Sequence, residues 1–123
     1  MASGIDDPLI PDREILYRRV SPEWVVSEGN SGQRRLSSAA FQNLSGNAFS
    51  VHRSNLTKPT TVIARHPGYG LVSFSAGEAR SLSQGVTPEP TEDEPAHAHV
   101  NGDKNKKIKS AFRDIARWEI DIR

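Results

Sequence analysis

The chain has 123 residues, of which 35% are hydrophobic, and its 16 basic and 15 acidic side chains leave a formal net charge of +1. A chain of this length fits one compact domain, and its balanced charge argues against general nucleic-acid binding, which usually shows a clear basic excess. Because the sequence contains no cysteine, disulfides, zinc–thiolate sites, iron–sulfur sites and thiol catalysis are excluded.

The N-terminal residues 1–13 predict a flexible arm with little to bury, because they include two prolines and three aspartates. They lack the apolar segment of a signal peptide, and no apolar run in the sequence reaches the length of a membrane span. We therefore expect a cytoplasmic protein with no membrane contact and with a single domain over residues 14–120.

Short segments of alternating apolar and polar residues predict several β-strands. The expected strands are Glu14–Val20, Glu23–Ser27, Ala48–Arg53, Leu71–Ser75, Gln84–Thr87 and Ala96–Val100. In the first strand, either Arg18 or Arg19 must face inward, whichever side is the core. Between the second and third strands, Ser37–Phe41 forms either a turn into a short helix, which Ser38 could cap, or an irregular edge that buries Phe41.

The stretch from Thr60 to Gly77 holds the densest apolar run of the chain. Its first part, Thr60–Arg65, predicts one or two helical turns that end at His66, because a residue before proline is biased out of the helical region. Pro67 and Gly68 then predict a turn, and the strand that follows is expected to be central because both of its faces carry apolar mass.

A C-terminal helix over Lys104–Glu119 is the longest predicted element. Its apolar stripe consists of Ile108, Ala111, Phe112, Ile115 and Trp118. A second, basic stripe consists of Lys106, Lys109, Arg113 and Arg117. This stripe is either a solvated face or a docking ridge for an acidic partner or phosphate, and the acidic loop Glu89–Glu94 could instead pair with it. The elements together predict an α+β fold, a small, mostly antiparallel and curled sheet packed against this helix.

No complete catalytic or metal signature is present. His97 and His99 form an H-x-H pair that can chelate a metal, but a site needs further ligands, so we expect neither a metal nor a cofactor. His66 could act as a general base on a rigid turn or could simply bond to the backbone there. If the protein is an enzyme, the candidate catalytic residues are Arg18, Ser38, His66, Tyr69 and His97. Of these we expect His66, Tyr69, His97 and Arg18 to converge.

Several short blocks resemble a set of small bacterial proteins without a known activity. The blocks are LYRR at Leu16–Arg19, SSAAF at Ser37–Phe41, HPGYGL at His66–Leu71, AGEARSLSQGV at Ala76–Val86 and PAHAHVNG at Pro95–Gly102. A fainter similarity is to ADP-ribosyltransferase-like toxins, which pair an early strand arginine or histidine with a later tyrosine or serine. That resemblance implies such roles for Arg18, Tyr69 and Ser38, although the chain lacks the family's late catalytic glutamate.

Two functions from different classes follow. The first is a non-enzymatic accessory protein that binds another protein in a bacterial defence or stress system, and a protein encoded nearby is a candidate for that partner. The second is a small nucleotide-handling enzyme of ADP-ribosyltransferase-like or hydrolase type. The absence of a complete site and the balanced charge favour the first.

Overall fold

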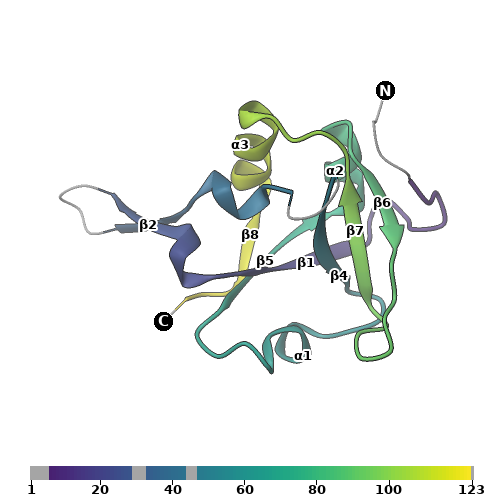
Figure 1. Ribbon diagram of the computed structural model, residues 1–123, viewed down its shortest axis with the longest axis horizontal. Helices are drawn as coiled ribbons and strands as arrows, with labels where there is room; N and C mark the ends of the chain where they lie inside the picture. Colours follow the sequence, from purple (N-terminus) through teal and green to yellow (C-terminus); the bar gives the residue numbers. More distant parts are fainter. Residues whose placement is uncertain (1–5, 29–32, 44–46, 123) are drawn as a thin grey trace.

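The computed structural model describes residues 6–28, 33–43 and 47–122 of the chain. Over these residues the protein is a small α+β domain with a six-stranded antiparallel sheet and three short helices (Figure 1). The predicted α+β class and the antiparallel pairing are therefore confirmed. Within the described part of the chain, no helix is both long and apolar enough to cross a membrane.

The main sheet has the strand order β6-β7-β4-β1-β5-β8, and a separate hairpin is formed by β2 and β3. The strands are β1 (Ile15–Val20), β2 (Val25–Glu28), β3 (Gln33–Leu36), β4 (Ala48–Arg53), β5 (Gly70–Ser75), β6 (Gly85–Pro88), β7 (His97–Asn101) and β8 (Arg117–Ile120). The α-helices are α1 (Pro59–Ile63), α2 (Ala76–Ser81) and α3 (Lys106–Ile115), and two 3₁₀ turns are η1 (Pro22–Trp24) and η3 (Ser38–Phe41). The hairpin of β2 and β3 extends away from the main sheet (Figure 1).

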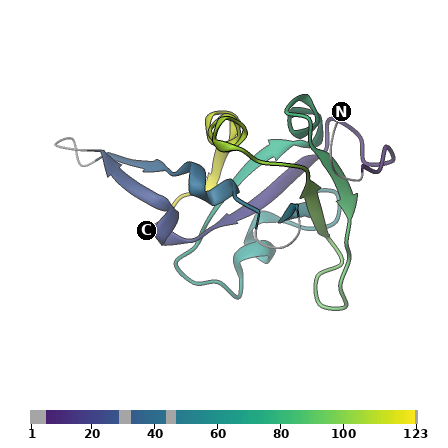
Figure 2. The ribbon, with the colours of Figure 1, turned by 45° about the horizontal axis from the view of Figure 1, so that its top comes forward.

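The sheet is not curled, and our expectation of a curled sheet is wrong. Its edge strands β6 and β8 are separated by four strands and do not pair with each other. Helices lie on both sides of it, with α3 and α2 on one face and α1 on the other (Figure 2). Because separate elements cover the two faces, the sheet has no need to close on itself in order to bury its apolar residues.

Four phenylalanines form the centre of the core on the α3 face of the sheet. The ring of Phe112 from α3 lies 5.6 Å from Phe41, 5.4 Å from Phe49 and 5.1 Å from Phe74, measured between centroids. All four rings are fully or almost fully buried. The predicted docking of α3 by its apolar stripe is thus confirmed for Phe112, and Phe41 is buried on η3, whose N-cap is Ser37 rather than Ser38.

The C-terminal helix is shorter than the sequence predicted, because the segment after it forms a strand. Helix α3 begins after Asn105, whose side-chain oxygen accepts from the backbone N–H of Ile108 at 2.9 Å. It ends at Ile115, and the next residue, Ala116, has an extended ψ of 140°. From there Trp118, Ile120 and Ile122 alternate with charged residues, a period of two that suits the strand β8 paired with β5. Trp118 and Arg117 therefore do not belong to the helical stripes.

The segment 6–13 packs against the domain, where the sequence led us to expect an arm with little to bury. Ile10 is 1% exposed and belongs to the core cluster. Arg80 of α2 donates to the carboxylates of Asp6 and Asp12 at 3.0 and 2.6 Å. The backbone N–H of Asp7 also donates to the carbonyl of Val86 at 2.8 Å. The part of the expected arm before residue 6 lies outside the described residues.

The stretch around the Pro67–Gly68 turn follows the prediction closely. Helix α1 is short, the chain turns at Gly68 with φ of +85°, and β5 is internal, between β1 and β8. A positive φ of this kind is a conformation that glycine adopts at little cost. The turn therefore reverses the chain so that α1 can lie against the sheet face opposite α3.

Candidate functional site

The two neighbouring arginines of β1 point to opposite faces of the sheet. Arg18 is 4% exposed on the α3 face, where its guanidinium donates to the carbonyls of Ala40 and Ser50 at 2.9 and 2.8 Å. It also lies 4.5 Å from the centroid of Phe49, a cation–π distance. Burial, followed by the charge of Arg19, lowers the pKa of Arg18 to about 10. Arg18 is thus a buried structural residue, and Arg19 faces the α1 side.

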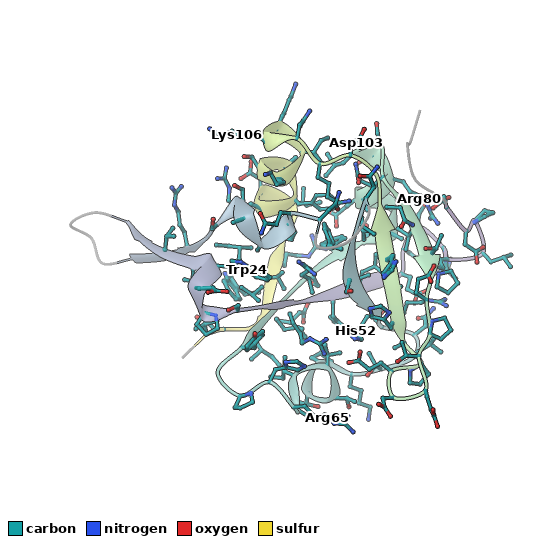
Figure 3. The ribbon with its side chains drawn as sticks, in the orientation of Figure 1. Trp24, His52, Arg65, Arg80, Asp103 and Lys106 are labelled. Carbon is teal, nitrogen blue, oxygen red and sulfur yellow. The ribbon has the colours of Figure 1, made fainter. Side chains whose placement is uncertain are left out.

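A cavity of about 350 Å³ lies on the α1 side, and we call it the α1–β7 pocket. Helix α1, the turn before it and the loop that leads into β7 form its walls. Its polar lining includes Arg19, His52, Arg65, His66, Asp93 and Glu94. Leu56, Val62, Ala64, Pro95 and Ala96 supply apolar surface. Figure 3 places His52 and Arg65 at the end of the molecule that carries α1.

Glu94 connects two of these polar groups. Its Oε1 accepts a hydrogen bond from Arg19 Nη1 at 3.0 Å and lies 3.3 Å from His52 Nε2. Arg19 Nη1 also donates to the carbonyl of Val62 in α1 at 3.1 Å. The guanidinium therefore links β1, α1 and the loop before β7, and it fixes the carboxylate in the wall of the pocket.

His52 is buried and lacks well-formed hydrogen bonds. Both ring nitrogens are inaccessible and have no hydrogen-bond partner among the described residues, since the approach to Glu94 does not meet hydrogen-bond geometry. Burial, followed by the charge of Arg19, lowers the pKa of His52 to about 4. At neutral pH the imidazole is therefore uncharged, and such a buried polar group without partners is a feature that needs an explanation.

Glu94 is a carboxylate under the same conditions. Its partial burial alone would raise its pKa, but the hydrogen bond from Arg19, the charge of His52 once it is protonated and the charge of Arg19 lower the pKa below the ordinary value. The pocket wall thus presents a guanidinium, a carboxylate and a neutral imidazole next to one another. This set can donate and accept hydrogen bonds without carrying a large net charge.

The structure does not bring Arg18 together with His66, Tyr69 and His97. Arg18 and Ser38 lie on the α3 face, because Arg18 bonds to η3 and Ser38 is part of it. His66 lines the α1–β7 pocket, and the ring of Tyr69 lies 5.2 Å from it. His97 lies beside His52, with ring centroids 5.6 Å apart. The sheet therefore separates the five residues into two groups.

The H-x-H pair lies on the surface of the sheet, where His97 contacts other residues of the domain. His97 contacts the carbonyl of Glu89 at 2.8 Å and the hydroxyl of Ser50 at 2.9 Å, one through each ring nitrogen. The His99 ring lies 5.2 Å from it. In the described part of the chain, no group of three or more potential ligands could hold a metal ion.

Sequence reasoning missed Arg19, His52 and Glu94. His52 could have been found, because strand alternation places it opposite the core residues Phe49 and Val51, and pairing of β4 with β7 sets it directly across from His97. Glu94 gave no comparable signal, since its acidic loop was interpreted as a possible partner of the basic helix. The loop actually lies at the α1 end of the molecule, away from α3 (Figure 2).

A second surface feature lies on the α3 side, at the edge strand β8. It is a shallow groove of about 420 Å³, which we call the β8 groove, lined by Arg35, Leu36, Arg113, Asp114, Ala116 and Trp118. Trp118 is 40% exposed. Of the predicted basic stripe, Lys106, Lys109 and Arg113 are on α3, whereas Arg117 is in β8 and forms an ion pair with Glu78 at 3.0 Å.

Comparisons with known proteins do not assign the chain to a family. No family model matches the chain, and neither a curated protein nor a solved structure matches it. The resemblances to the small bacterial proteins and to the toxins therefore remain expectations from short sequence blocks.

Proposed function

We propose that this is a non-enzymatic accessory protein that acts by binding another protein, as one component of a bacterial defence or stress system. The observation that supports this function is the exposed Trp118 on a free sheet edge. Among the described residues, β8 pairs only with β5, so the outer edge of β8 can accept a strand from another chain. Adding a strand to an exposed edge is a common mode of protein recognition.

The groove beside this edge fits an extended, acidic segment with an apolar anchor. Trp118, Ala116 and Leu36 give the groove an apolar floor, and aromatic residues of this kind dominate the binding energy of many interfaces. Arg113 lines the groove, and Lys106 and Lys109 lie on the same helix. Arg113 is paired with Asp114, which also lines the groove. The charges of Lys106 and Lys109 therefore favour an acidic partner and would steer its approach.

The catalytic alternative has less support. A nucleotide-handling enzyme with the predicted residues would need Arg18 and Ser38 beside His66, Tyr69 and His97, and the sheet lies between these two groups. The α1–β7 pocket holds other polar residues that sequence reasoning did not select. They lead to a separate inference about ligand binding, which is developed below.

The docking function can be tested by isolating the protein with its native partner. We expect the partner to co-purify with the wild-type chain and to be lost from Trp118→Arg, which places a charge on the anchor position. Leu9→Arg is the matched control, because Leu9 is 85% exposed on a different part of the surface. The partner's binding segment, once identified, should be acidic and should bind the purified protein directly.

Two results would contradict the docking function. One is a partner that binds Trp118→Arg as tightly as it binds the wild type. The other is a chain that is recovered alone, or that only associates with a second copy of itself in sedimentation measurements.

A further inference from the structure

The ion pair in the α1–β7 pocket uses only part of its hydrogen-bonding capacity. Arg19 makes both of its described hydrogen bonds through Nη1, to Val62 and to Glu94. Glu94 receives Arg19 on Oε1, and His52 approaches the same oxygen. Within the described residues, Nη2 and Nε of Arg19 and Oε2 of Glu94 are therefore left for another molecule. The pocket thus offers a donor and an acceptor on adjacent side chains.

An adjacent donor and acceptor complement a lactam edge, in which a ring carbonyl lies next to a ring N–H. Glu94 Oε2 can accept from the ring N–H, while the Arg19 guanidinium donates to the carbonyl. Uracil, thymine, guanine and hypoxanthine carry this edge, whereas adenine and cytosine do not. Hydrogen bonds to charged groups of this type are stronger than those between neutral groups.

We propose that the α1–β7 pocket binds a nucleobase with a lactam edge, which Glu94 and Arg19 recognise through its N–H and its carbonyl. This site lies on the opposite side of the sheet from the β8 groove, so the inference goes beyond the proposed docking function and does not depend on it.

The remainder of the pocket suits a flat ring system. Its volume of about 350 Å³ lies at the small end of the usual range for ligand pockets, roughly 300–1,000 Å³. Leu56, Val62 and Pro95 provide apolar surface for the faces of a ring. The charges of Arg19, Arg65, Asp93 and Glu94 balance, which favours an uncharged base over an isolated anion.

His52 is the second observation that points to a ligand. It is 4% exposed, lines the pocket and has no hydrogen-bond partner for either ring nitrogen among the described residues. Buried polar side chains without partners are uncommon in folded proteins, and each needs an explanation, of which a bound molecule is one. Because His52 lies against Glu94 Oε1, it restricts the access of a ligand to that oxygen. The other carboxylate oxygen, Oε2, is therefore the one available to a ligand. His52 is in this sense a positioning residue.

The bound nucleobase can belong to a nucleoside, a nucleotide or an RNA strand. Substitution of Arg65 can distinguish the ligands that carry a phosphate from the nucleoside. Arg65 is exposed at the pocket, and no described carboxylate forms an ion pair with it. It is placed to contact a phosphate attached to a bound base. If the natural ligand is phosphorylated, Arg65→Ala should therefore weaken the binding of uridine monophosphate or of a short oligouridylate. The affinity for uridine should stay unchanged.

The experiment compares matched ligands on the full chain by isothermal titration and by NMR chemical-shift mapping. Uridine is compared with 3-methyluridine, and inosine with 1-methylinosine, because the methyl group replaces the hydrogen of the ring N–H and leaves the carbonyl in place. We expect at least tenfold weaker binding after methylation and at least tenfold weaker binding of cytidine and adenosine. Glu94→Gln should remove this discrimination, whereas Glu92→Gln, on an exposed acid of the same loop, should retain it.

Each alternative result has a clear meaning. Equal binding of methylated and unmethylated nucleosides would overturn the inference even if Glu94→Gln failed to fold, because it requires only the wild-type protein. Equal binding of cytidine and uridine would overturn it as well. No binding of uridine, inosine or their monophosphates up to millimolar concentration would exclude a nucleobase site. Weaker binding of the methylated nucleosides, of cytidine and of adenosine, with uridine and inosine bound, would support it.

Discussion

Phe112 is the residue through which α3 is attached to the sheet. It is fully buried and contacts the rings of Phe41, Phe49 and Phe74. Phe112→Ala should lower the free energy of unfolding by about 3–5 kcal/mol, because it removes apolar contacts and leaves a cavity that three rigid rings cannot easily fill. Chemical denaturation monitored by circular dichroism gives this value, and a loss below about 1 kcal/mol would show that the site is not core.

His52 should make the stability of the protein depend on pH. Its pKa is near 6.5 in the unfolded chain and is lowered to about 4 in the folded state. Between these values the unfolded chain binds a proton that the folded chain does not, so stability is fully present above pH 6.5 and is lost as the pH falls towards 4. The expected loss between pH 7 and pH 4.5 is about 2–3 kcal/mol.

The comparison with His52→Gln isolates this contribution. The groups that face His52 are Arg19, Glu94 and His97; Glu94 has a lowered pKa and loses its stabilising effect only at lower pH. His66 and His99 also have lowered pKa values and act in the same direction. The free energy of unfolding of the variant should therefore fall less than that of the wild type over this range. Equal slopes for the two proteins would show that His52 is not responsible.

The first strand shows how far residue-level prediction can reach. The sequence indicated that one arginine of β1 must face inward, and the structure confirms this for Arg18. The choice between Arg18 and Arg19 could not be made, because each face of the strand carries two apolar residues and one arginine. The choice is decided by distant groups, namely the carbonyls of Ala40 and Ser50 and the ring of Phe49, whose positions depend on tertiary structure.

At the scale of elements, the segment 6–13 is held by one apolar residue and by a set of charges. Ile10→Ala should lower the free energy of unfolding by about 2–4 kcal/mol, because Ile10 is buried in the core cluster. Leu9→Ala is the matched control, since Leu9 is 85% exposed, and it should change stability by less than about 0.5 kcal/mol.

Thermal and chemical denaturation of the two variants test this directly. If both behave like the wild type, segment 6–13 contributes nothing to stability and the simpler expectation of a loose arm was adequate. The sequence could not predict the contact, because a single isoleucine among prolines and aspartates has no periodic pattern. The segment is also held by Arg80, which lies far along the chain and forms ion pairs with Asp6 and Asp12.

The end of α3 shows why element boundaries are harder to predict than elements. Residues 108, 112, 115 and 118 fit a helical stripe, and residues 118, 120 and 122 fit a strand equally well. Both patterns include Trp118, so the hydrophobic pattern alone does not decide where the helix stops. The free edge of β5 decides it, because pairing there satisfies the backbone groups of Arg117–Ile120. The internal strands and α1 had no such competing pattern and were predicted correctly.

At the scale of the whole molecule, the sheet separates two candidate binding surfaces. The β8 groove lies on the α3 side and the α1–β7 pocket on the α1 side, and no residue lines both. We expect Trp118→Arg to leave the affinity for uridine unchanged, and Glu94→Gln to leave partner binding unchanged. Titration of each variant with the ligand of the other surface measures this independence. A change of more than about threefold in either affinity would reveal a coupling free energy between the two faces of about 0.6 kcal/mol or more.

The strand order of the sheet also affects how the chain behaves during synthesis and after proteolysis. Strand β5 has five buried residues out of six, and its outer edge is covered by β8, which follows every other strand along the chain. During synthesis this edge stays uncovered until β8 has emerged, and proteolytic removal of β8 would uncover it again. An uncovered, apolar strand edge is a template for intermolecular pairing. Clipping near Ala116 should therefore cause the protein to aggregate, visible as light scattering, before the aromatic core itself comes apart.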